Sequence, residues 1–321
     1  MMRFARWLSL ILVLGLAGVT QAAPLAAQEH ETAGEHAAER GKAAEIDILH
    51  HIGNSDEIEL PFGVVWHLPH WQPIQVGKYA IDLSPTKHTV FMLFAAIIVA
   101  LTFILSGRAV QKAQRSGKPP KGFASAMEAT ALWVRQDVVL PNAGPHSAAF
   151  APYILTLFLF ILVMNLLGIL PWGATPTGNI SVTAGLALVA FLVIEISGMK
   201  ALGFKGYMGT IFFLPHGLPG GVGGMILKPI MLVIFTVIEI IGKLAKPFAL
   251  AVRLFANMTA GHVLVLALIG LTFIIKSFSV GIASSLMATG IMLLEVFVAF
   301  LQAYVFALLT AVFIGLMQEA H

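Results

Sequence analysis

Long apolar runs that are almost free of charge constrain this chain more than any other feature. The run from Thr89 to Gly107 has nineteen residues without an Asp, Glu, Lys or Arg. A helix needs roughly 17–25 apolar residues to cross the hydrocarbon core of a bilayer. Only 11% of the chain is charged, against about 25% in soluble domains, and its mean hydropathy is +0.88. The sequence predicts an all-α polytopic membrane protein and excludes an ordinary soluble enzyme.

Composition excludes several kinds of chemistry. The chain has no cysteine, which rules out disulfides, cysteine metal sites and thiol nucleophiles. Its formal net charge of +3 is small and scattered, so we expect membrane lipid and no nucleic acid as a partner. The sequence has no phosphate-binding loop. We therefore predict a non-catalytic protein with no cofactor and no metal site.

Residues 1–28 have the pattern of a secretory signal peptide. Arg3 and Arg6 form a basic start, and the apolar core from Leu8 to Val19 is too short to span a bilayer. Small residues that suit cleavage follow: Ala22, Ala23, Ala26 and Ala27. An uncleaved anchor is the alternative. Either way, we expect the following segment to be exported.

Residues 29–80 are expected to form an exported acidic, histidine-rich arm. Six of the eleven histidines lie between His30 and His70. A metal-binding tail is one interpretation, but no regular ligand spacing supports it, so we favour a solvated, partly disordered arm. Trp66, Trp71 and Tyr79 precede the first span, where interfacial aromatic residues are expected.

Residues 81–321 are predicted to form the membrane domain. The first span is followed by basic residues without an acidic one among them, which places this loop in the cytoplasm: Arg108, Lys112, Arg115, Lys118 and Lys121. The stretch 123–139 resembles an amphipathic helix at the membrane interface. Spans at 149–170 and 180–199 follow, and then a glycine- and proline-rich loop at 201–224.

The last hundred residues are too long for two ordinary spans. Residues 284–317 would form one helix of about 50 Å, against a hydrocarbon core of about 30 Å, and ordinary tilts of about 20° do not absorb the excess. Either these segments break, or residues 225–270 and 284–317 form a strongly tilted helical hairpin. We favour the hairpin, which makes about five membrane helices in all.

Ionisable side chains within this hairpin are the candidate functional residues. Each costs about 2.5–3.5 kcal/mol on insertion scales, so a function is expected by default. Arg253 lies about 21 Å along the helix axis from Glu239 and about 13 Å from His262, in opposite directions. Asn257 lies one turn beyond Arg253, and the second arm contains Glu295 and Gln302 seven residues apart.

The protonation chemistry of these groups suggests two access paths with a barrier between them. Arginine does not deprotonate in proteins, so Arg253 can block a proton but cannot relay one. His262 and Glu295 can exchange protons. The pattern suits two aqueous paths that are separated by a fixed positive charge.

Structural roles compete with this interpretation for some residues. Lys243 is expected to extend toward the cytoplasmic interface, as is Lys246, while Lys246–Pro247 is also compatible with a simple kink. Glu239 is four residues before Lys243 and is able to form an ion pair with it. Glu195 near the end of the third span, and His216, are weak candidates.

The residues around Arg253 resemble the signature of subunit a of F-type ATP synthases. The resemblance rests on the run Lys246-Pro-Phe-Ala-Leu-Ala-Val-Arg253-Leu-Phe-Ala-Asn257-Met258. Met164-Asn-Leu-Leu-Gly-Ile-Leu-Pro171, Leu301-Gln-Ala-Tyr304 and the Glu239-to-Arg253 interval fit as well. The similarity extends from about residue 80 to the carboxyl terminus.

This resemblance implies a stator subunit beside a rotating ring of c subunits in a bacterial plasma (inner) membrane. The implied partners are the c-ring, b-type peripheral stalk subunits and the remainder of the ATP synthase. Arg253 would face the ring carboxylate between two half-channels. The exterior path would contain Asn257, His262, Glu295 and Gln302, with Asn165 also lining it, and Glu239 would belong to the cytoplasmic path. Small residues would let the ring approach: Ala249, Ala256, Ala260 and Gly261.

Two positions depart from relatives of this type. Some members have a carboxylate where this chain has His262 and a histidine where it has Glu295, and we interpret the exchange as preserving function. Gly168 stands where some relatives have an acidic residue, so that acid makes no contribution to the exterior path here.

Two other classes of function remain as alternatives. A self-contained secondary transporter or channel would use Arg253 to bind a substrate anion, although the lack of an internal repeat weighs against inverted-repeat folds. A purely structural membrane anchor would not need the charge of Arg253 for ion flux.

Overall fold

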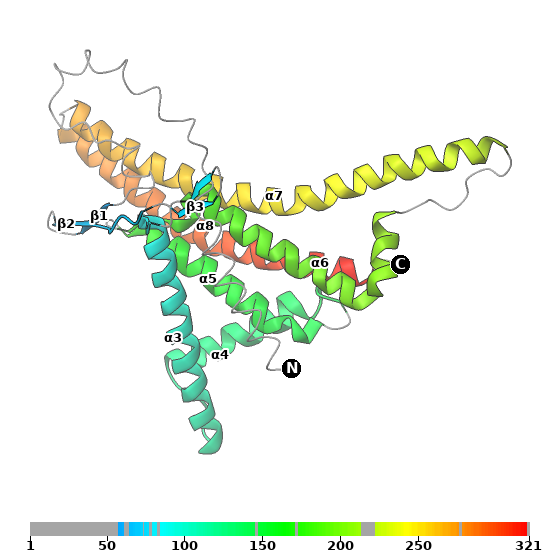
Figure 1. The fold of residues 1–321 in the computed structure, drawn as a ribbon. Helices are drawn as coiled ribbons and strands as arrows, with labels where there is room; N and C mark the ends of the chain where they lie inside the picture. The colour runs from blue at the N-terminus through cyan, green and yellow to red at the C-terminus, as the bar shows by residue number, and fades with distance from the viewer. Residues whose placement is uncertain are drawn as a thin grey trace, which may run out of the picture.

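Long helices make up most of the structure (Figure 1). The computed structural model describes residues 57–60, 64–72, 74–76, 79–81, 84–144, 147–170, 173–212, 222–275 and 278–319. The predicted signal peptide and the acidic part of the arm up to residue 56 lie outside these ranges, as does His216.

Four of the described helices are long and apolar enough to cross a membrane. They are α3 (Lys87–Arg115), α5 (Ala151–Ile169), α6 (Ile180–Ile211) and α8 (Phe278–Glu319). The best stretches of these helices have mean hydropathies between 2.2 and 2.6. A further long helix, α7 (Val222–Ile275), is not among the four. The prediction of an all-α polytopic membrane protein is confirmed.

Two small β-hairpins precede the helices. Strand β1 (Glu57–Leu60) pairs antiparallel with β2 (Val64–His67), and β3 (Ile74–Val76) pairs with β4 (Tyr79–Ile81). The His67 imidazole lies 3.2 Å from the Glu57 carboxylate across the first hairpin. The sequence analysis did not predict these strands, although short glycine-containing segments between β-branched and aromatic residues favour hairpins.

The predicted amphipathic stretch at 123–139 is helical throughout. It consists of α4 (Phe123–Trp133), which continues into one π-helical turn, η2 (Val134–Val139). Val134, Val138 and Val139 pack into the core, whereas Arg135 and Asp137 are exposed. Its place at a bilayer surface stays a prediction.

Helix α6 extends beyond the end that the sequence predicted. Residues 201–211, which we expected in a loop, continue as helix after a kink at Gly203. Gly203 has a φ of 69°, in the left-handed region that glycine adopts without a steric penalty. The kink turns the end of α6 back toward its own preceding turns, which the pattern of apolar residues did not reveal.

Helices α7 and α8 form the expected hairpin. The break between Ile275 and Phe278 falls at the predicted turn, and the two helices lie side by side. In Figure 1 they run at a large angle to α3. Because α8 has 42 residues, it measures about 63 Å along its axis and needs this inclination to stay within a bilayer.

Small residues along α8 allow the helices to pack closely. Every fourth position over five positions is buried and small: Ala299, Ala303, Ala307, Ala311 and Gly315. Such residues let helix backbones approach one another in membranes. They face the core that is built mainly from α5, α6 and α8, and α7 adds Leu250, Leu254 and Met258.

Gly315 tests how tight this packing is. A Cβ atom at Gly315 would collide with the backbone carbonyl oxygen of Asn142, which cannot rotate away. We expect Gly315→Ala to lower the melting temperature of the detergent-solubilised protein, because overpacking costs about 1–3 kcal/mol. Gly290→Ala is the control, since a Cβ at Gly290 would meet open space on the same helix. Equal melting temperatures for the two variants would contradict this packing.

Candidate functional site

Arg253 lies on a face of α7 that the rest of the chain leaves open. Its side chain is exposed, and so are neighbouring residues on that face: Ala249, Ala256, Asn257 and Ala260. Leu250, Leu254 and Met258 are buried on the other side of the helix. Among the described residues, the guanidinium has no ion-pair or hydrogen-bond partner. Arg253 therefore presents an uncompensated positive charge at the surface of an apolar helix pair.

His262 and Glu295 meet across the α7–α8 hairpin. The distance from His262 Nδ1 to Glu295 Oε1 is 2.7 Å. Glu295 is buried and His262 is half-buried. A Cβ at Gly261 would lie 2.8 Å from the same carboxylate oxygen. Gly261 therefore leaves room for Glu295 to reach His262. It does not belong to the exposed face that Ala249, Ala256 and Ala260 form.

The other nitrogen of His262 contacts the end of α5 and the loop that follows. Nε2 lies 2.8 Å from the carbonyl oxygen of Gly168 and 2.8 Å from Thr175 Oγ1. A Cβ at Gly168 would collide with the Thr175 side chain. The absence of a side chain at Gly168 thus leaves the space that Thr175 needs to reach His262.

These contacts fix where the protons of the pair are held. The Gly168 carbonyl can only accept a hydrogen bond, so Nε2 carries a proton. Nδ1 then shares one further proton with Glu295, giving either an imidazolium–carboxylate pair or a neutral imidazole with a carboxylic acid. The His262–Glu295 pair is thereby able to accept and release a single proton.

Asn165 ties three elements together. It is fully buried, its Nδ2 donates to the Ala299 carbonyl oxygen at 3.2 Å, and its Oδ1 accepts from Thr177 Oγ1 at 2.7 Å. Thr177 belongs to a short helical turn, η4 (Pro176–Gly178). Gln302 is buried on α8, seven residues beyond Glu295. Asn257 is exposed beside Arg253 instead of joining the His262 cluster.

A small cavity lies against His262, which we call the His262 cavity. Its volume is about 20 Å³, and Lys87 and His88 of α3 line it together with Thr175, Thr259 and His262. A polar cavity of this size holds about one water molecule. Water in this cavity would connect the His262–Glu295 pair to the amino-terminal end of α3.

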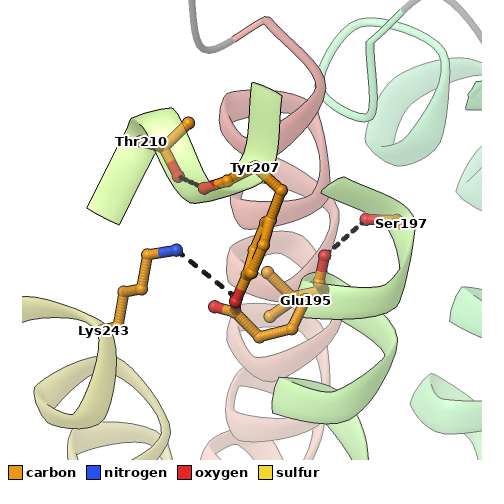
Figure 2. A network of polar contacts seen from close by, with 6 residues as sticks. Glu195, Ser197, Tyr207, Thr210 and Lys243 are labelled. Carbon is orange, nitrogen blue, oxygen red and sulfur yellow. Dashed lines mark hydrogen bonds and ion pairs between the residues drawn. The ribbon is translucent and has the colours of Figure 1, made fainter. Parts of the chain in front are cut away.

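A second small cavity lies on the opposite side of Arg253, which we call the Lys243 cavity. Its volume is about 10 Å³, and Glu195, Lys243, Lys246 and Met317 are among the residues that line it. Lys243 Nζ lies 3.4 Å from Glu195 Oε2, and the Tyr207 hydroxyl donates to the same oxygen (Figure 2). Small cavities that adjoin ionisable side chains therefore lie on both sides of Arg253 along α7.

Two structural interpretations of the lysines are wrong. Lys243 does not extend to an interface and does not pair with Glu239, because it is buried against Glu195 of the neighbouring helix. Glu239 is half-buried, and no ion-pair partner for it is found in the described part of the chain. The alternative of an i,i+4 pair with Glu239 fails because that spacing describes an isolated helix and ignores the helix packed beside it.

Sequence reasoning missed four residues that contact the site. Thr175 and Thr177 lie between the predicted spans at 149–170 and 180–199, and Lys87 and His88 directly precede the first uncharged run. Two titratable residues directly before an apolar run were the available signal for Lys87 and His88. No local sequence pattern predicts that Thr175 contacts His262, which lies 87 residues further along the chain.

Comparisons with known proteins give a consistent result. Residues 89–315 match the family described as ATP synthase A chain. The chain is 43% identical over 299 residues to ATP synthase subunit a 2 of Chlorobaculum tepidum, covering 92% of this chain and 79% of that protein. It is 42% identical over 319 residues to ATP synthase subunit a 2 of Prosthecochloris aestuarii, covering 98% and 93%. The subunit a of Myxococcus xanthus is 40% identical over 283 residues, covering 81% and 88%.

The contact between Gly168 and Thr175 provides a test of the His262 environment. We expect Gly168→Ala to lower the melting temperature by displacing Thr175 from His262, at a cost of about 1–3 kcal/mol for overpacking. Gly178→Ala is the matched control in the same loop region, because its nearest atoms would lie at an ordinary 3.7 Å. If Gly168→Ala melted with the wild-type protein, the close contact would be refuted.

Proposed function

The chain belongs to the ATP synthase A chain family, and from this we propose that it is the proton-translocating stator subunit of a rotary F-type ATP synthase. Subunit a is a non-catalytic, multi-pass subunit of the membrane sector. The proposal adds how this chain moves protons: through two offset half-channels, with Arg253 as the barrier between them.

The exposed guanidinium of Arg253 is the observation that supports this mechanism best. An arginine in the middle of a membrane helix costs about 2.5–3.5 kcal/mol on insertion scales unless it is compensated. The described residues offer it no counter-charge. We infer that the partner that compensates this charge comes from another subunit, and a carboxylate is the group that an arginine pairs with most strongly.

In the proposed assembly that carboxylate belongs to a ring of c subunits. The exposed alanines around Arg253 leave room for a neighbouring helix to approach closely. A neutral, protonated ring carboxyl group can face lipid, whereas a charged one cannot. Arg253 stabilises the charged carboxylate, so the proton leaves the ring as that group arrives.

The exterior half-channel is proposed to use the His262–Glu295 pair. The pair shares one proton across 2.7 Å and adjoins a cavity that is large enough for a water molecule. Gln302 and Asn257 would accompany the proton toward the ring. Asn165 uses both ends of its amide to tie α5 to α8 and η4, so its role in this path is to position those elements.

The cytoplasmic half-channel is proposed to lie on the other side of Arg253, where Glu239 and the Lys243 cavity are found. The basic residues at the end of α3 favour a cytoplasmic location for that end. This orientation places the amino terminus on the periplasmic side of a bacterial plasma membrane and the carboxyl terminus in the cytoplasm. The b-type peripheral stalk and the catalytic head would complete the complex.

Replacing Arg253 tests the mechanism directly. We expect Arg253→Ala to reduce proton-driven ATP synthesis in membrane vesicles by at least about 100-fold, as the loss of a preorganised charge does. The amount of assembled complex should change little, because Arg253 makes no contact that the described chain depends on. Arg115→Ala, at the exposed end of α3, is the control.

Synthesis at the wild-type rate by Arg253→Ala vesicles would overturn the mechanism. Proton transport by the purified chain alone in liposomes would favour a self-contained transporter instead, because a stator needs its ring.

Exchanging the two members of the proton-sharing pair gives a second test. We expect His262→Glu combined with Glu295→His to support faster ATP synthesis than either single change, because only the double variant keeps one imidazole beside one carboxylate. The measurement is ATP synthesis per assembled complex. Equal losses in all three variants would count against a shared proton.

A further inference from the structure

A polar cluster that no sequence motif predicted is formed by Glu195, Lys243 and Tyr207. Glu195 is 8% exposed and Lys243 is 7% exposed. The Lys243 ammonium lies 3.4 Å from Glu195 Oε2 and 4.5 Å from the centre of the Tyr207 ring. Figure 2 shows Lys243 and Tyr207 converging on the same Glu195 carboxylate.

The kink at Gly203 makes this cluster. Glu195 and Tyr207 are twelve residues apart, a separation of about 18 Å along a straight helix. The left-handed conformation of Gly203 reverses the direction of the chain between them, so that the Tyr207 hydroxyl meets the Glu195 carboxylate. The end of α6 is thus folded back to hold one acidic side chain.

The cluster lies on the inner side of the Arg253 barrier. Lys243 is ten residues before Arg253, which is about 15 Å along α7, and His262 is about 13 Å away in the opposite direction. Glu195 and Lys243 both line the Lys243 cavity. An acidic group therefore adjoins a small cavity on each side of Arg253: Glu295 through His262, and Glu195.

Stability gives little reason to keep such a cluster. Replacing a buried ion pair by apolar residues is often neutral or stabilising, because desolvating both charges is costly. Both contacts to Glu195 go to Oε2, and among the described residues its other oxygen, Oε1, has no hydrogen-bond partner. Oε2 of Glu195 is therefore held by two partners, and Oε1 is able to accept a hydrogen bond from water or to take up a proton.

We propose that Glu195 is a proton-transfer group of the cytoplasmic half-channel and that Lys243 and Tyr207 are its positioning residues. This inference rests on the proposed function. The proton that leaves the ring carboxyl group beside Arg253 passes through water to the Glu195 carboxylate, which then releases it to water on the cytoplasmic side. Glu195 returns to the carboxylate, and no other bond changes. Glu239 lies further along the same route.

The first test removes the proton-accepting group and keeps its size. Glu195→Gln, assembled in the complete ATP synthase, retains an oxygen that accepts from Tyr207. We expect ATP synthesis per assembled complex, and passive proton flux after removal of the catalytic head, to fall about 100-fold, the low end for a positioned proton-transfer group. Glu195→Asp keeps a carboxylate and should recover part of the flux.

A second variant separates proton transfer from structure. Glu195→Gln combined with Lys243→Met removes both charges, so no lysine is left buried without a partner. If the cluster only stabilised the fold, this double variant would assemble and conduct like the wild type, and the proposal would be overturned. We expect it to assemble but to remain as slow as Glu195→Gln alone.

An accessibility test leaves Glu195 in place. Because the chain has no cysteine, Ala187→Cys would put a single thiol in the wall of the Lys243 cavity. We expect Ag⁺ added on the cytoplasmic side to inhibit proton flux through this variant relative to its own untreated rate. Ala190→Cys, buried on the same helix outside the cavity wall, should be unaffected.

The outcomes distinguish this inference from the proposed function. Wild-type proton flux in Glu195→Gln, or resistance of Ala187→Cys to Ag⁺, would overturn the role of Glu195. The proposed stator function would still hold if Arg253→Ala had lost ATP synthesis. ATP synthesis by Arg253→Ala would remove both.

Discussion

Every charge that this chain brings into its apolar helix bundle must be compensated, and this requirement organises the structure. Glu195 and Lys243 compensate each other between α6 and α7, and Glu295 is compensated by His262 between α8 and α7. Each pair joins two helices that follow one another along the chain, through residues 48 and 33 positions apart. The two long helices of the hairpin are thereby held at fixed positions along their neighbours by polar contacts, and the alanine positions on α8 allow the close approach that these contacts need.

His262 shows how one side chain coordinates several elements. Its ring contacts Glu295 of α8, the last turns of α5 through Gly168, and Thr175 of the loop before η4. Two glycines make this arrangement feasible, because a Cβ at Gly168 or Gly261 would occupy the space of Thr175 or Glu295. A side chain at either position would crowd the residues that hold the imidazole. The placement of the imidazole depends on these neighbours as much as on its own position in the sequence.

Local patterns predicted the helices well and the contacts between distant segments poorly. The long apolar runs predicted α3, α5, α6 and α8, and segment length predicted the inclined hairpin, because bilayer thickness limits a straight helix. The expectation that His262 and Glu295 exchange protons across the hairpin agrees with the contact between them. The continuation of α6 past Gly203 was missed because apolar periodicity does not record a backbone kink. The pairing of Lys243 with Glu195 was missed because it depends on how α6 packs against α7. The strands of the arm and the contacts of Thr175 were missed for a similar reason, as they join residues without a shared local pattern.

Arg253 and Lys243 are two cations on one helix, and they differ in burial and in pairing. Lys243 is buried, paired with Glu195 and placed against the Tyr207 ring, whereas Arg253 is exposed and has no partner among the described residues. A bundle that can build an internal counter-charge for one cation could build one for the other. Arg253 also lies on the face of α7 where the neighbouring side chains are alanines, which gives another helix access to it. The difference between the two cations is best explained by a counter-charge for Arg253 that is supplied from outside the chain and must be able to leave, as a carboxylate on a moving partner would.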